Sequence, residues 1–94
     1  MEIQILVLGL NCYTNQELEQ LATLFNEEYN LKKLPSSEYY LLCLIPENDV
    51  VEISEEMEEI SKYHSNPAWE IITRNINSQA ELDSLANQLY FEKT

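Results

Sequence analysis

The chain alternates between short apolar runs and amphipathic stretches, which is typical of a domain that mixes strands and helices. Residues 2–10 read EIQILVLGL, and the apolar run from Ile5 to Leu10 is rich in branched side chains and too short for a helix. Such a run predicts a central strand that is buried on both faces. The apolar runs at residues 39–45 and 69–76 predict a second core strand and a last strand.

Three capped segments predict helices between and after these strands. Thr14 and Glu17 form a capping box, in which each side chain accepts a hydrogen bond from the other residue's backbone amide. Ser54 is expected to cap a second helix, and Ser78 and Glu81 form a second capping box before a third. Apolar side chains at helical spacing follow each cap. They are Leu18, Leu21, Ala22, Phe25 and Tyr29, then Met57 and Ile60, then Leu82, Leu85, Ala86 and Leu89.

Residues 50–53 (VVEI) decide between two fold classes. If they form a short third strand in a hairpin with residues 39–45, the order is β-α-β-β-α-β with an extra C-terminal helix, which is an α+β, ferredoxin-like plan. If they begin the second helix, the order is βαβαβα, a small three-layer domain. We favour the ferredoxin-like plan because residues 47–49 make a connection of hairpin length. Residues 31–37 are predicted to be a plain connection, and residues 1–94 one compact acidic domain.

The balance of charge narrows the possible functions. There are 17 Asp and Glu against 5 Lys and Arg, a net charge of −12, although the charged share of 23% is ordinary for a globular protein. Direct binding to nucleic acid is not expected, because it requires Lys and Arg to displace counterions. No apolar run approaches the roughly 20 residues of a membrane span, and the start at Met1 lacks the basic region of a signal peptide. We therefore expect a cytoplasmic protein without membrane contact.

Candidate catalytic residues are few. Gly9 is the sole glycine, which excludes the glycine-rich loops that hold phosphates. Cys12 precedes a predicted helix N-terminus, a position that lowers a thiol pKa, whereas Cys43 lies inside an apolar strand and is expected in the core. His64 is the sole histidine and lacks further ligands at metal-binding spacing, and nothing in the spacing demands that it meet Cys12. We expect no enzyme activity, no cofactor and no metal.

The acids are concentrated in one segment, since seven of the 17 lie within the 13 residues 47–59. Four of them recur at i, i+3, i+4 and i+7 from Glu52, which places them on one helix face. The row is either a solvated face, which the helix macrodipole favours in the first turn, or a recognition surface for a basic partner. Tyr13, Tyr63 and Tyr90 are expected to be exposed, and an aromatic beside the acids suits an interface. The residues expected to bind a partner are Glu47, Asp49, Glu52, Glu55, Glu56, Glu59 and Tyr63.

In size, acidity and lack of catalytic residues, the chain resembles the small inhibitors encoded by phages and mobile elements, including nucleic-acid-mimic anti-restriction and anti-CRISPR proteins. The resemblance lies in composition and carries over no individual residue. It implies an inhibitor that binds a basic, nucleic-acid-binding surface of a partner protein, such as a defence nuclease or effector. Two alternatives stay open: a small thiol-dependent redox or transfer protein that uses Cys12, and a structural homodimer that buries a sheet edge or an apolar helix face.

Overall fold

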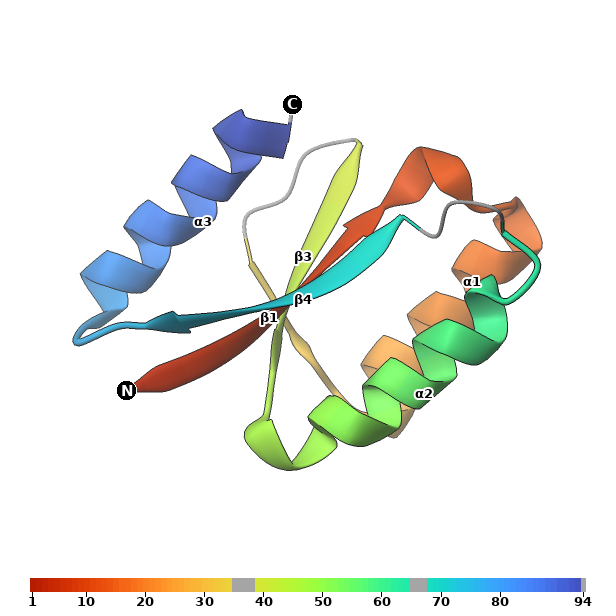
Figure 1. Cartoon of the computed structure of the whole chain (residues 1–94), viewed down its shortest axis with the longest axis horizontal. Helices are drawn as coiled ribbons and strands as arrows, with labels where there is room; N and C mark the ends of the chain where they lie inside the picture. Colours follow the sequence, from red (N-terminus) through yellow and green to blue (C-terminus); the bar gives the residue numbers. More distant parts are fainter. Residues whose placement is uncertain (35–38, 65–67, 94) are drawn as a thin grey trace.

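The computed structural model describes residues 1–34, 39–64 and 68–93, without the side chains of residues 86 and 89–93. The elements are β1 (Glu2–Gly9), α1 (Asn15–Thr23), β2 (Lys32–Lys33), β3 (Tyr40–Ile45), α2 (Val50–Ser61), β4 (Trp69–Asn75) and α3 (Gln79–Lys93). The strands form a four-stranded sheet in the order β2-β3-β1-β4, and all neighbours are antiparallel. Helices α1 and α2 cover one face and α3 the other (Figure 1), so the fold is mixed α+β in three layers.

Strand β1 is buried on both faces, as its apolar run predicts. Ile5 and Leu6 are both 0% exposed, and successive side chains of a strand point to opposite faces. Ile5 packs in one cluster with Leu82 of α3, whereas Leu6 packs in the other with Leu21 of α1 and Met57 of α2. β1 therefore connects the two halves of the core.

Most predicted elements are confirmed. β3 and β4 match the predicted strands to within one residue, and α1 begins at the predicted capping box. The N–H of Glu17 donates to Thr14 Oγ1 at 3.2 Å, and the N–H of Thr14 donates to Glu17 Oε1 at 2.8 Å. The chain then continues in one π-helical segment, Leu24–Glu28. Asn30 follows with a φ of 50°, a left-handed conformation that asparagine adopts more readily than most residues.

The favoured interpretation of residues 50–53 as a strand is wrong, because they form the first turn of α2. A 3-10 turn at Glu47–Asp49 leads directly into this helix. In a strand, Val51 and Ile53 would point to the same face, yet Val51 is 68% exposed and Ile53 is 0% exposed. Helical spacing instead brings Ile53 and Met57 together in the core. The alternative, that these residues begin the second helix, is confirmed.

The strand on the outer side of β3 is β2, in the segment predicted to be a plain connection. Lys32 is opposite Leu44, and the N–H of Leu34 donates to the carbonyl of Leu42 at 2.9 Å. Both lysines of β2 are exposed. No apolar alternation therefore marks this strand in the sequence, and it forms because the edge of β3 offers partners for its backbone.

Other details of the helices differ from the predictions. Ser54 lies inside α2 rather than capping it, and its hydroxyl donates to the carbonyl of Val50 at 2.8 Å. Ala22 is exposed and is not part of the buried stripe of α1. At α3, Ser78 accepts from the N–H of Glu81 as predicted, although the Glu81 carboxylate accepts from residue 77 rather than from Ser78. The side chains of residues 86, 89 and 90, which the sequence analysis used, lie outside the described part of the structure. Among the described residues, no helix is long and apolar enough to cross a membrane.

Two substitutions test the helical start of α2. Ile53→Ala should lower the free energy of unfolding by about 2–5 kcal/mol, because it leaves a cavity in the core. Val51→Ala should change it by less than about 0.5 kcal/mol, because that side chain faces solvent. Urea denaturation followed by circular dichroism measures both values. Equal losses at the two positions would favour a strand and contradict the helix.

Candidate functional site

Four carboxylates follow the exposed face of α2, and we call them the acidic stripe: Glu52, Glu55, Glu56 and Glu59. All four are exposed, while Ile53 and Met57 are buried on the other side of the same helix. Residues three and four apart are neighbours on a helix surface, so the stripe is one continuous surface. Each like-charge pair at i,i+4 costs about 0.2–0.5 kcal/mol. The structure thus gathers on one surface the predicted residues that lie on α2.

One cation meets the stripe at its C-terminal end. The Lys62 Nζ lies 2.7 Å from Glu59 Oε1, and this hydrogen bond together with the negative charge raises the pKa of Lys62. The same Nζ is 5.1 Å from the ring centroid of Tyr63, which is 87% exposed as predicted. Within the described ranges, no cation pairs with the other three stripe carboxylates. Most of the stripe is therefore uncompensated negative charge.

The stripe contacts Tyr29, which directly follows the π-helical segment Leu24–Glu28. The Tyr29 hydroxyl donates to Glu52 Oε2 at 3.3 Å. Burial raises the pKa of Tyr29, and the charges of Glu52, Glu56 and Glu28 raise it further. Tyr29 therefore contacts the stripe, although it is 23 residues from Glu52 in the sequence and sequence reasoning missed this contact. The available signal was Tyr29 itself, since a tyrosine at the edge of an apolar stripe needs a polar partner for its hydroxyl.

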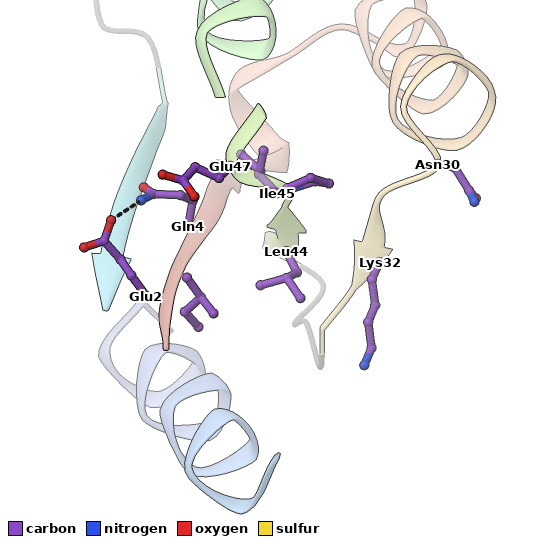
Figure 2. A pocket seen from close by; sticks show the side chains of 9 residues that line it. Glu2, Gln4, Asn30, Lys32, Leu44, Ile45 and Glu47 are labelled. Carbon is purple, nitrogen blue, oxygen red and sulfur yellow. Dashed lines mark hydrogen bonds between the residues drawn. The ribbon is translucent and has the colours of Figure 1, made fainter. Parts of the chain in front are cut away.

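Two predicted partner-binding residues precede α2 and are not part of the stripe. Glu47 and Asp49 belong to the 3-10 turn before α2, and Asp49 is half-buried. Glu47 lines a separate hollow of about 280 Å³ at the ends of β1 and β3. Figure 2 shows Glu2 and Glu47 on one side of this hollow, with Asn30 and Lys32 on the other. We therefore do not group Glu47 with the stripe.

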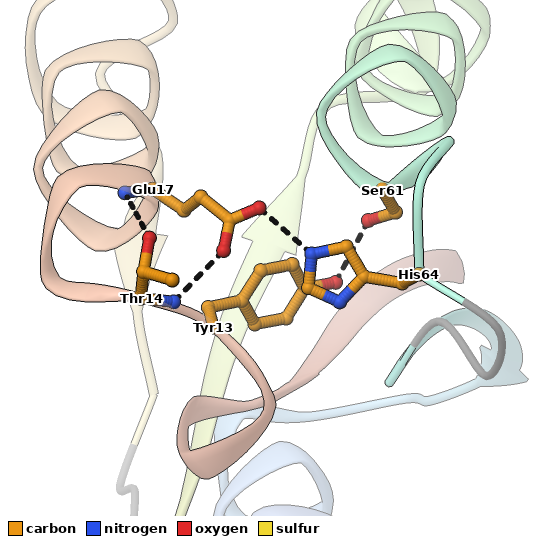
Figure 3. A network of polar contacts seen from close by, with 5 residues as sticks. All are labelled: Tyr13, Thr14, Glu17, Ser61 and His64. Carbon is orange, nitrogen blue, oxygen red and sulfur yellow. Dashed lines mark hydrogen bonds and ion pairs between the residues drawn. The ribbon is translucent and has the colours of Figure 1, made fainter.

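A polar network joins the start of α1 to the end of α2 (Figure 3). Glu17 Oε2 lies 2.7 Å from His64 Nε2, and the hydroxyls of Tyr13 and Ser61 are 2.9 Å apart in a buried position. The rings of Tyr13 and His64 pack with their centroids 5.0 Å apart. Burial raises the pKa of Tyr13, and the hydrogen bond with Ser61 partly opposes this effect. The predicted exposure of Tyr13 is wrong, because its ring fills the space between the two helices.

The network borders an open hollow of about 640 Å³, on which the exposed Cys12 also lies. Cys12 ends a 3-10 turn, Leu10–Cys12. The fold thus brings Cys12 and His64 to one hollow, while the Nε2 of His64 is bonded to Glu17. The thiol chemistry considered for Cys12 stays a prediction. Cys43 is buried as predicted, and burial raises the pKa of its thiol to about 11.

No protein family, curated protein or solved structure matches the chain. Among the described residues, no group of three or more His, Cys, Asp and Glu is arranged to hold a metal ion. Only the residues of this chain therefore indicate what it could bind. Its most extended chemical feature is the acidic stripe, with Tyr29 beside it and Tyr63 beyond its C-terminal end.

The hydrogen bonds of Glu17 predict a pH dependence of stability. The bond from the Thr14 amide and the bond with His64 hold the pKa of Glu17 below its usual value near 4.5. A carboxyl whose pKa falls on folding stabilises the protein above its ordinary pKa, and this contribution disappears as the pH falls through the folded value. Glu17→Gln keeps an acceptor for the Thr14 amide but loses the charge.

Wild type should therefore exceed Glu17→Gln in stability near neutral pH, and the difference should shrink below about pH 4.5. Urea midpoints measured across this range give the comparison. Glu19→Gln is the matched control, because Glu19 is exposed on the same helix and no described hydrogen bond involves it. A difference for Glu17→Gln that stays constant with pH, or an equal one for Glu19→Gln, would contradict the assignment.

Proposed function

We propose that the protein is a non-enzymatic inhibitor that binds a basic, nucleic-acid-binding surface of a partner protein, of the kind that phages and mobile elements use against host defence. The observation that carries the proposal is the acidic stripe on α2. Its carboxylates are exposed, they share one helix face, and all but Glu59 lack a cation within the described ranges. An acidic surface of this kind speeds encounter with a basic surface by electrostatic steering.

The spacing of the stripe supports mimicry of a nucleic-acid backbone. Carboxylates at i and i+4 are about 6 Å apart along a helix axis, because the rise is about 1.5 Å per residue. Phosphates repeat about every 3.4 Å along each strand of a duplex. The stripe therefore presents negative charge at a comparable density. A groove lined with Lys and Arg would therefore experience a similar electrostatic field from the stripe and from a nucleic-acid backbone.

Aromatic side chains near the stripe support a protein partner rather than a small ligand. Tyr63 is 87% exposed, and tyrosine is among the residues that most often dominate binding energy at interfaces. Tyr29 lies half-buried beside Glu52 and offers part of its ring. The carboxylates would steer the approach of the partner and fix the alignment of the two surfaces. The aromatic rings would supply apolar area that is buried in the complex.

We also propose that the chain follows the ferredoxin-like β-α-β-β-α-β plan with α3 added at its C-terminus. The strand order β2-β3-β1-β4 and the antiparallel pairing support this proposal. In this plan, β2 pairs with β3 in a hairpin, the pairing first expected of residues 50–53, but it precedes that strand in the chain instead of following it. One face of the sheet then carries two helices side by side, and the outer surface of one of them is the proposed interface.

A matched pair of variants tests the proposed function. The stripe variant replaces its four carboxylates: Glu52→Gln, Glu55→Gln, Glu56→Gln and Glu59→Gln. The control variant removes the same charge outside α2: Glu2→Gln, Glu19→Gln, Glu27→Gln and Glu81→Gln. Each protein is immobilised and used to capture proteins from a lysate of the native host, with and without excess duplex DNA.

Wild type and control should retain a nucleic-acid-binding protein that excess duplex DNA displaces, and the stripe variant should retain at least about tenfold less. Retention should also fall steeply as salt rises, because the contact is largely electrostatic. Circular dichroism confirms that both variants fold. Equal capture by all three proteins would refute the role of the stripe, and capture that DNA does not affect would refute mimicry.

A further inference from the structure

Strand β4 forms one edge of the sheet, and half of its backbone groups face outward. The N–H of Ile76 donates to the carbonyl of Met1, and the N–H of Gly9 donates to the carbonyl of Ala68. Backbone groups alternate in direction along a strand, so even-numbered residues of β4 face β1 and odd-numbered residues face away. Within the described residues, no strand pairs with that outer edge. The outward groups belong to Trp69, Ile71, Thr73 and Asn75.

The side chains of β4 have a pattern that complements itself. One face of the sheet carries the side chains of Glu70, Ile72 and Arg74, because successive side chains of a strand point to opposite faces. Glu70 and Arg74 are both exposed, and they are the charged residues of a strand whose net charge is zero. In a chain of net charge −12, this edge lacks the negative excess that would repel a second copy.

We propose that β4 pairs with β4 of a second copy, antiparallel and centred on Ile72. This register places Glu70 of each copy opposite Arg74 of the other. It also places Ile71 opposite Thr73 of the other copy. The outward N–H groups of these residues can then donate hydrogen bonds to the outward C=O groups of the other copy. The opposed charges then fall at non-hydrogen-bonded pairs, where side chains approach most closely. A shift by two residues in either direction keeps the backbone bonds but loses both charge pairs.

The free edge is partly protected in a single copy. The Arg74 guanidinium donates to the carbonyl of Thr73 at 2.9 Å, and this carbonyl is one of the groups that face outward. Charged side chains on an edge strand commonly hinder unwanted pairing. Here the same guanidinium would leave the carbonyl and meet Glu70 of the second copy. The dimer is therefore reversible and depends on concentration.

Charge reversal and charge exchange test this register. Sedimentation equilibrium compares wild type with Glu70→Arg, with Arg74→Glu and with the double variant that carries both. Each single reversal places like charges opposite one another at two symmetric positions, so dimerisation should weaken by at least about tenfold. The double variant restores opposite charges and should dimerise like wild type.

The two single variants also distinguish the specific pairing of Glu70 with Arg74 from the general electrostatic repulsion between two negatively charged chains. Glu70→Arg lowers the net negative charge, so general repulsion alone would make it dimerise more strongly than wild type. The proposal predicts the reverse. A wild type that stays monomeric up to about 1 mM would overturn the proposal. So would a folded double variant that fails to recover, or single reversals that have no effect. Because these variants leave the four stripe carboxylates unchanged, the results can be read separately from partner binding at α2.

Discussion

The burial of β1 on both faces is the constraint on which the rest of the structure depends. Ile5 and Leu6 are adjacent and point in opposite directions, yet each is fully buried. One layer of helices could cover only one of them. The chain therefore places α1 and α2 on one face and α3 on the other, as Figure 1 shows. Each helix has one buried face and one face left to solvent.

That arrangement explains how α2 tolerates a row of like charges. The like-charge pairs of the stripe cost about 0.2–0.5 kcal/mol each. Full burial of an Ile or Met side chain stabilises a protein by about 1.5–3 kcal/mol, and Ile53 and Met57 are both 0% exposed. The buried face thus outweighs the repulsion on the exposed face. The packing of Ile53 and Met57 against the core stabilises α2. The exposed face of α2 can therefore serve a function without contributing to stability.

Sequence pattern predicted β1, the capping box at Thr14, the core position of Cys43 and the spacing of the acidic stripe. It failed at residues 50–53, because a short apolar run fits a strand or a helix and the sheet decided between them. It missed β2, since two exposed lysines have no pattern of burial. It also missed the bond between Glu17 and His64, 47 residues apart, because a contact between helices depends on how both pack. The hydrogen bond between Tyr29 and Glu52 likewise depends on how the two helical segments pack.

We propose that the position of the acids, rather than the net charge, makes the binding surface. The most direct measurement is a titration of the isotope-labelled protein with a short oligolysine peptide at low ionic strength, followed by amide chemical shifts. We predict that the largest shifts fall on α2 from Glu52 to Glu59 and around Tyr29, and that they disappear in the stripe variant. Shifts spread evenly over the acids of β1, α1 and α3, or centred away from α2, would contradict the claim.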